Sequence, residues 1–265
     1  MKKVLGLISM ALLALLTTSC FEQKAVIRLN KDGSGTITET TLLSAEASAM
    51  LDSIPAGAGG EDPLSKMADK EQAAANAKKI GEGVEVVKSA KIDKDGKKGV
   101  EVVYSFKDIN KVSFTMGGSM AESAKAMNPA AAAKETEQKP VTFKYADGVL
   151  TLANPPNKPV EKPADAPKPE IGPQELEMAK GMFKDMRMSF KVEFADGLAE
   201  TNASHVEGNT ITIADIQFAK LMEDPEKLKK LMELNDEGPA AAAALFKDTP
   251  GIKVESKEEL TVKLK

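Results

Sequence analysis

The chain has 265 residues, a formal net charge of −4, one His, one Cys and no Trp. A single Cys excludes a disulfide within the molecule, and one His without Cys partners excludes the usual zinc sites. The acidic balance disfavours nucleic acid as a partner, because phosphate binding needs clustered Lys and Arg. We therefore expect no metal, no cofactor and no nucleic acid.

Residues 1–19 have the layout of a secretory signal peptide. Lys2 and Lys3 form a basic start, residues 4–16 are almost wholly apolar, and residues 17–19 are small. The apolar run is too short to span a bilayer, which needs about 20 residues. We predict that residues 1–19 form a signal helix that is removed, which leaves 34 basic and 40 acidic residues and a net charge of −6.

Cys20 follows this segment directly, and a cysteine at this place resembles the lipobox of bacterial lipoproteins. In that family the sulfur receives a diacylglyceryl group, the signal is cut before the cysteine, and the new amino terminus is acylated. The family prefers Leu where this chain has Thr17. Thr17 and Ser19 also suit the ordinary signal peptidase, which would leave a free thiol. Because an exposed free thiol is unexpected in an exported protein, we predict that Cys20 carries lipid.

Alternation of polar and apolar residues predicts antiparallel strands joined by tight turns. Three hairpins are expected, with their strands within residues 26–43, 84–106 and 141–152. One helix is expected to start near Ser44. A second is expected from Pro63 toward Ile80, with Asp62 as its N-cap. A short helix or strand covers residues 108–114.

Two segments are expected to stay outside the packed core. Residues 117–139 are rich in Ala, Lys and Glu and read as a mobile insertion. Residues 154–173 contain seven prolines and read as an extended linker. After the linker we expect strands, helices and one closing strand, at residues 188–194, 210–213, 216–222, 224–234, 239–246 and 252–264.

These elements predict an α+β fold, in which a curved antiparallel sheet built of hairpins carries helices packed on it. Residues 20–265 are expected to form one such domain after the signal helix. The prediction follows from the hairpin spacing and from the helical segments between and after the hairpins.

Residues 30–41 resemble the calcium loop of an EF-hand, with oxygen ligands at Asn30, Asp32 and Ser34. Two charged ligands are missing, since Asn30 replaces the first Asp and Thr41 replaces the bidentate Glu. The preceding residues have the pattern of a strand, whereas an EF-hand needs a helix there. We therefore predict a hairpin turn without a calcium ion.

Residues 117–121 approach the nucleophile elbow of hydrolases. The last Gly of that motif is missing, and the chain lacks the βαβ repeats that such a sheet requires. The one histidine, His205, follows Ser204, and neighbours on a strand point to opposite faces, so we expect no pairing between them. A hydrolase is a distant alternative, and we predict no catalytic residues.

Three further segments share a pattern of strands and turns, at residues 98–112, 143–152 and 188–213. Their order resembles the LppM family of bacterial lipoproteins, over roughly residues 24–215. The family usually has Pro and Trp where this chain has Asp196 and Ile213. The resemblance implies an α+β domain that can enclose an apolar cavity, and the family is associated with lipid binding. It transfers no individual functional residue.

Together these features predict a non-enzymatic lipoprotein of the cell envelope, anchored by acylated Cys20. Phe21 is not the Asp that often retains lipoproteins at the inner membrane, which favours the outer membrane with the domain in the periplasm. Two functions stay open. The protein binds an apolar or amphiphilic ligand such as a lipid, or its sheet contacts another envelope component of unknown identity. An apolar cavity would favour the first function and a filled core the second.

Overall fold

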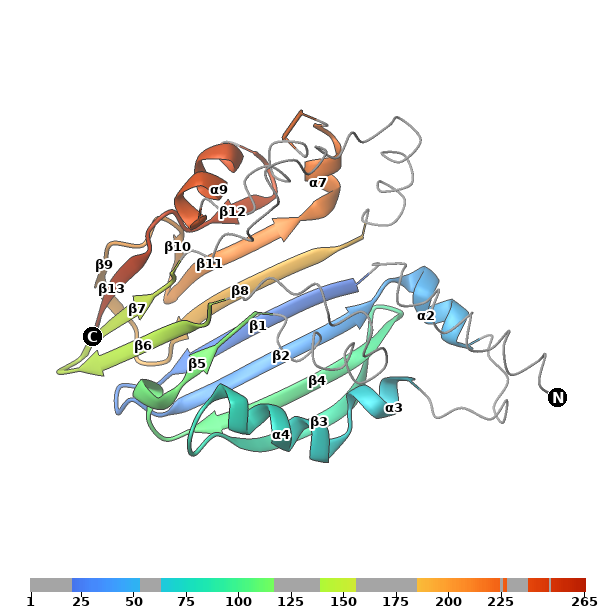
Figure 1. Cartoon of the computed structure of the whole chain (residues 1–265), viewed down its shortest axis with the longest axis horizontal. Helices are drawn as coiled ribbons and strands as arrows, with labels where there is room; N and C mark the ends of the chain where they lie inside the picture. The colour runs from blue at the N-terminus through green and yellow to red at the C-terminus, as the bar shows by residue number, and fades with distance from the viewer. Residues whose placement is uncertain are drawn as a thin grey trace, which may run out of the picture.

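The computed structural model describes residues 21–52, 63–116, 139–155, 185–224, 226–227, 238–247 and 249–265, which form two β-sheets with helices at their margins (Figure 1). The larger sheet has eight strands: β1 (Phe21–Leu29), β2 (Gly35–Leu43), β3 (Glu85–Lys94), β4 (Lys97–Phe106), β8 (Arg187–Phe194), β10 (Val206–Glu207), β11 (Thr210–Gln217) and β12 (Ile252–Val254). Their order is β10-β11-β8-β1-β2-β4-β3, and β12 also pairs with β11. The predicted α+β class is confirmed.

The smaller sheet has five strands in the order β5-β6-β7-β13-β9. Their bounds are β5 (Ser113–Phe114), β6 (Val141–Ala146), β7 (Val149–Ala153), β13 (Glu259–Leu264) and β9 (Leu198–Thr201). In Figure 1 this sheet lies in front of one end of the larger sheet. We call the face of the larger sheet that packs against it the inner face, and the opposite face the outer face.

All three predicted hairpins are present, as β1–β2, β3–β4 and β6–β7. Two of their turns share one sequence and one geometry. Asp95-Gly96 and Asp147-Gly148 each have positive φ at both residues. This is the pattern of a type I′ turn, whose twist matches that of the flanking strands.

The larger sheet is not purely antiparallel, which corrects the sequence prediction. Strand β8 pairs in parallel with β1, from Glu22 beside Arg187 to Leu29 beside Phe194. The pairing joins segments about 165 residues apart, beyond the reach of any hairpin signal. Both partners are central strands and therefore contribute alternate side chains to the core.

The closing strand predicted over residues 252–264 is also wrong, because it is divided between the two sheets. Strand β12 pairs with β11 in the larger sheet, whereas β13 pairs with β7 and β9 in the smaller one. Glu255 lies at the crossing and is fully buried. Its carboxylate accepts hydrogen bonds from Ser204 N at 2.7 Å, Ser204 Oγ at 2.8 Å and Lys257 N at 3.1 Å.

The main core fills the space between the two sheets. Fully buried side chains come from the inner face of β1 and β8 and from β7 and β13, among them Ile27, Val192, Leu150 and Leu260. The rings of Phe114 and Phe190 pack across the layers with centroids 5.1 Å apart. Each fully buried side chain of this size contributes roughly 1.5–3 kcal/mol to folding.

The described helices pack against parts of the larger sheet that the smaller sheet does not cover. Their bounds are α2 (Ala45–Asp52), α3 (Pro63–Met67), α4 (Lys70–Ile80), the 3₁₀ turn η1 (Ile109–Lys111), α7 (Phe218–Met222) and α9 (Gly238–Phe246). Helix α4 buries Ala73, Ala77 and Ile80, and the last two join the main core. Leu221 of α7 and Phe246 of α9 form a second small core with Ile252.

The structure differs from the sequence prediction in three helical segments. The helix expected from Pro63 to Ile80 is broken, because the Asp69 carboxylate accepts a hydrogen bond from Gln72 N and starts α4 as its N-cap. Residues 108–114 contain both a 3₁₀ turn and a short strand. The helix expected from residue 216 starts at Phe218, since β11 extends to Gln217.

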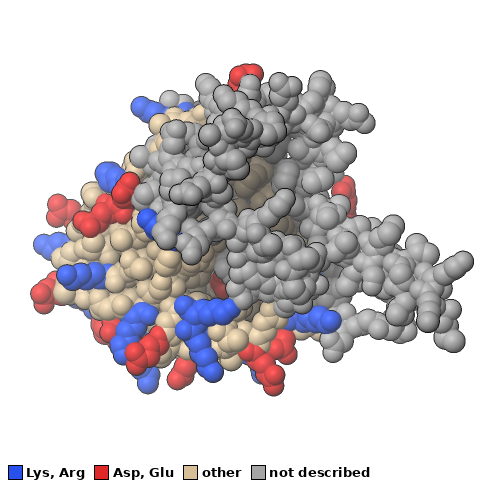
Figure 2. Space-filling model, viewed as in Figure 1, with Lys and Arg blue, Asp and Glu red and all other residues tan. Residues whose placement is uncertain are grey.

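Four predicted segments fall mainly or wholly outside the described residues: the signal helix at 1–19, the insertion at 117–139, the linker at 154–173 and the helix at 224–234. On the face shown in Figure 2, positive and negative side chains are interspersed over the described part of the surface. None of the described helices is long and apolar enough to cross a membrane.

Glu255→Gln should destabilise the junction between the sheets by about 2 kcal/mol, because an amide cannot replace both carboxylate acceptors. Burial raises the pKa of Glu255, but the hydrogen bonds from Ser204 and Lys257 outweigh burial and lower it overall from 4.5. A lowered carboxyl pKa contributes stability above about pH 4.5 that is lost as the pH falls through the folded-state pKa.

Urea unfolding of the wild type and Glu255→Gln at pH 7 and pH 3 checks this prediction. The difference between the two proteins should be large at pH 7 and should shrink at pH 3. An equal difference at both pH values would show that Glu255 does not act through its charge.

Candidate functional site

The predicted lipidation site, Cys20, lies outside the described residues, and the described chain starts at the next residue. Phe21 is the first residue of β1 and pairs with Leu43 of β2. Glu22 already pairs on both sides, with Leu42 and with Arg187. The residues that directly follow Cys20 are therefore part of a central strand.

The inner face of the larger sheet changes character along its length. Toward the Leu29 end of β1 it is apolar, whereas toward the Phe21 end it carries buried polar side chains. We call these residues, Gln23, Glu39 and Thr41, the polar strip, and we include Tyr104, which lies opposite Ile37 farther toward the Leu29 end. Gln23, Glu39 and Thr41 are 2%, 5% and 9% exposed, and Tyr104 is fully buried. Polar groups on a core face need partners, because burying them unpaired costs free energy.

Tyr104 is the most deeply buried member of the polar strip. Its hydroxyl finds no hydrogen-bond partner of ordinary geometry among the described residues. Burial raises the pKa of this phenol, and the nearby charge of Glu39 raises it further. The amide of Asn76 on α4 also lies near the hydroxyl and acts in the opposite direction. Tyr104 therefore stays protonated and can donate a hydrogen bond.

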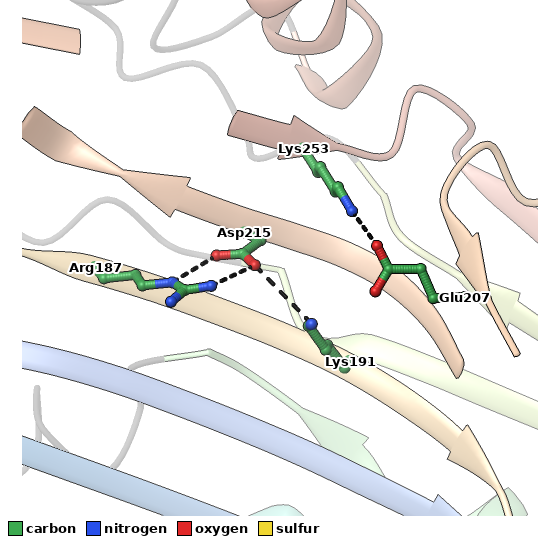
Figure 3. Close-up of polar contacts among 5 residues, drawn as sticks. All are labelled: Arg187, Lys191, Glu207, Asp215 and Lys253. Carbon is green, nitrogen blue, oxygen red and sulfur yellow. Dashed lines mark hydrogen bonds and ion pairs between the residues drawn. The ribbon is translucent and has the colours of Figure 1, made fainter. Parts of the chain in front are cut away.

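The outer face carries a second polar set, drawn in Figure 3. We call the residues Arg187, Lys191 and Asp215 the charged ladder. Arg187 Nε and one terminal nitrogen each donate to an Asp215 oxygen at 2.9 Å, and Lys191 Nζ lies 4.0 Å from the same carboxylate. The hydrogen bonds that Arg187 donates to Asp215 raise the pKa of Arg187. Bidentate pairs of this kind fix both side chains in orientation.

Register explains why these three side chains meet. Asp215 on β11 lies directly opposite Ser189 on β8, and Arg187 and Lys191 flank Ser189 on the same face. The Ser189 hydroxyl is buried beneath them, and no described residue partners it. The two cationic side chains therefore approach the Asp215 carboxylate from the two diagonal positions on β8.

Next to the charged ladder, Lys253 of β12 pairs with Glu207 of β10 at 2.5 Å (Figure 3). The hydrogen bond from Lys253, followed by the charges of Lys253 and Lys191, lowers the pKa of Glu207. Both side chains are largely exposed, so water screens the pair. The charges of this region largely neutralise one another, which suits a solvated sheet face better than an anion-binding site.

The structure gives a different account for each motif that the sequence suggested. Residues 30–41 form the predicted hairpin turn between two strands, with Asp32 Oδ1 accepting from Ser34 N at 2.9 Å and Ser34 Oγ at 2.6 Å. These bonds use the oxygens that a calcium ion would need. Among the described residues, no group of three or more His, Cys, Asp or Glu side chains could hold a metal ion. Residues 117–121 lie outside the described residues.

The polar groups of Ser204 and His205 contact other residues of the fold. Both Ser204 donors bind Glu255, and His205 Nε2 lies 3.2 Å from the Val254 carbonyl oxygen. The expectation that these residues do not pair rested on a strand, but they lie in the loop between β9 and β10. His205 is partly buried.

Sequence reasoning missed the polar strip and the charged ladder. A signal for Glu39 existed, because alternation places it on the same face as the buried Ile37. The charged ladder had no such signal, since Arg187 and Asp215 meet only through the pairing of β8 with β11.

No protein-family model and no curated protein matches the chain. Among solved structures, the NMR structure of the folded domain of Mycobacterium tuberculosis LppM is similar, at 14% sequence identity and a TM-score of 0.33. The match covers 75% of this chain and 82% of that chain. The LppM domain suggested by the sequence is thus a structural neighbour, at a similarity that supports no conclusion about function.

Asp215→Asn should lower the free energy of unfolding by about 1 to 2 kcal/mol, because Arg187 and Lys191 lose their shared anion. The estimate is kept below that of a buried pair since the Arg187 side chain is 40% exposed. Urea unfolding at pH 7 measures the change. Glu207→Gln is the matched control and should leave stability unchanged; an equal loss in both variants would contradict a special role for Asp215.

Proposed function

We propose that this chain is a non-enzymatic protein of the cell envelope, held to a membrane by lipid on Cys20. One observation carries the proposal: Phe21, the residue that follows Cys20, is the first residue of the central strand β1. Cleavage before Cys20 leaves every described strand and helix intact. The modified residue then becomes the first residue of the mature chain.

The absence of an enzymatic role is part of the proposal. Ser204 and His205 are the pair from which a nucleophile and a base would be drawn, and they bind Glu255 and Val254 instead. The phenol of Tyr104, with its raised pKa, is a poor base at neutral pH. The polar groups described above therefore suit binding and folding better than proton transfer.

We place the anchor in the outer membrane, with the domain on the periplasmic side. The support is the identity of residue 21, which is Phe rather than the Asp that often retains lipoproteins at the inner membrane. The partner in this location is the lipid bilayer itself, reached through the acyl chains on Cys20.

The close packing of the described core supports a structural role over ligand binding. Side chains of both sheets occupy the layer between them, with Leu150, Leu152 and Leu260 fully buried. This favours a protein that presents its surface to another envelope component. Binding of an amphiphile is the second candidate, at the polar strip, where the buried Tyr104 hydroxyl can donate to a polar headgroup.

Cys20→Ser should release the mature protein from the membrane fraction and abolish its labelling by radioactive fatty acid. The serine oxygen cannot form the thioether, and without acyl chains the mature acidic chain has no comparable anchor. Cell fractionation and metabolic labelling in a bacterial host measure both effects. Unchanged membrane association in Cys20→Ser would contradict the proposal, and Ser19→Ala serves as the matched control.

The amphiphile candidate is tested on a soluble form that starts at Glu22, purified gently from a bacterial host. If the polar strip binds a headgroup, native mass spectrometry should detect bound lipid. Tyr104→Phe should lower that occupancy because the variant removes only the hydroxyl donor. Tyr145→Phe, on β6 of the smaller sheet, is the matched control. A lipid-free protein would leave the interaction role as the sole candidate.

A further inference from the structure

We propose that one end of the larger sheet faces the lipid surface, so that the strands stand up from the membrane. The inference rests on the proposed acylation of Cys20. Its structural basis is the missing linker: Cys20 is covalently joined to Phe21, which pairs with Leu43 in the sheet. Consecutive Cα atoms are about 3.8 Å apart, so the acylated residue cannot move far from this end.

The anchor also lies at the middle of that end. Strand β1 is the fourth of seven strands in the order β10-β11-β8-β1-β2-β4-β3, with three on each side. The register brings the start of β8, the β3–β4 turn and the end of β11 to the same end as Phe21. In Figure 1 helix α2 also lies at this end. We call this the anchor end.

The opposite end carries the β1–β2 turn, the β6–β7 turn and Lys265. Tyr145 of β6 donates its hydroxyl hydrogen to the Lys31 carbonyl oxygen at 2.7 Å, which joins the first two turns. Lys265 N donates to the Gly197 carbonyl oxygen nearby. The two ends are separated by the length of β1, whose nine residues make eight residue-to-residue steps. At about 3.3 Å per residue, this is a separation of roughly 26 Å.

The chemistry of the anchor end fits an interface with lipid headgroups. Phe21 and Leu43 are only partly buried there. Aromatic side chains are favoured at headgroup depth, and Lys side chains can extend their charge into water. Lys97 Nζ lies 3.6 Å from the Glu22 carboxylate, so part of the charge at this end is already balanced. The orientation therefore depends on the tether and not on anionic lipid.

A flat orientation, with the outer face on the membrane, would also keep Phe21 near the lipid. The side chains of the outer face argue against a flat orientation, because they form ion pairs such as Arg28 with Glu193 and Arg187 with Asp215. Burying these charges in a bilayer would cost far more than leaving them in water. The inner face is covered by the smaller sheet and by α4. The upright orientation keeps both faces hydrated.

Two turns of the same sequence and geometry give a matched pair of probes. Lys94 is the last residue of β3 and Ala146 the last of β6, each is exposed, and each precedes an Asp-Gly turn. Lys94 lies at the anchor end and Ala146 at the opposite end. The chain contains no Trp, so Lys94→Trp and Ala146→Trp each report from one position. Thr38→Trp, in the middle of the outer face, reports a flat orientation.

The experiment uses the full acylated chain, extracted from a bacterial membrane and reconstituted in phosphatidylcholine vesicles that contain a headgroup nitroxide lipid. The nitroxide should quench Lys94→Trp and leave Ala146→Trp and Thr38→Trp unchanged. The same pattern is expected after anionic lipid is added. A flexible Gly-Ser linker inserted between Cys20 and Phe21 should abolish the quenching of Lys94→Trp while flotation with the vesicles persists.

Flotation separates the two proposals. A chain that does not float with vesicles lacks the anchor, and both proposals then fail. A chain that floats but shows quenching of Ala146→Trp or Thr38→Trp keeps the anchor and overturns the upright orientation. Lack of quenching at Lys94 in a floating chain also overturns it. Lys97→Trp, directly opposite Lys94 in the hairpin, repeats the reading if Lys94→Trp fails to fold.

Discussion

Strand β1 is hydrogen-bonded on both sides from Glu22 to Leu29, and most of the structure is arranged around that double pairing. On one side it forms the local hairpin with β2, and on the other it accepts the distant β8 in parallel. The same strand contributes the buried apolar side chains of Ala25, Ile27 and Leu29 to the core. Because the strand begins one residue after Cys20, the position of the proposed anchor and the position of the core are set by one element.

Buried polar groups mark the places where this fold departs from a simple packed core. Glu255 joins the two sheets through hydrogen bonds from Ser204, and its depressed pKa follows from those bonds. The polar strip places Gln23 and Glu39 on the inner face near the anchor end. The Tyr104 hydroxyl of this strip is buried without a hydrogen-bond partner among the described residues, which is why we connect the strip with binding of a polar headgroup.

Sequence reasoning predicted the local elements well, because hairpins and Asp-Gly turns are encoded by neighbouring residues. It did not predict the parallel β1–β8 pair or the division of residues 252–264 between sheets, since both depend on contacts between distant segments. The same reason explains the missed charged ladder at Asp215. The lipidation of Cys20 stays a prediction from sequence, since its signal is the apolar segment before it rather than a contact in the fold.

The central claim is that the mature chain begins at an acylated Cys20, and its intact mass tests this most directly. The protein should be extracted from the membrane fraction and measured by mass spectrometry without proteolysis. We predict the mass of residues 20–265 plus a diacylglyceryl group and an amide-linked acyl chain. The unmodified mass of residues 20–265, with a thiol that reacts with iodoacetamide, would show cleavage by the ordinary signal peptidase and would contradict the account.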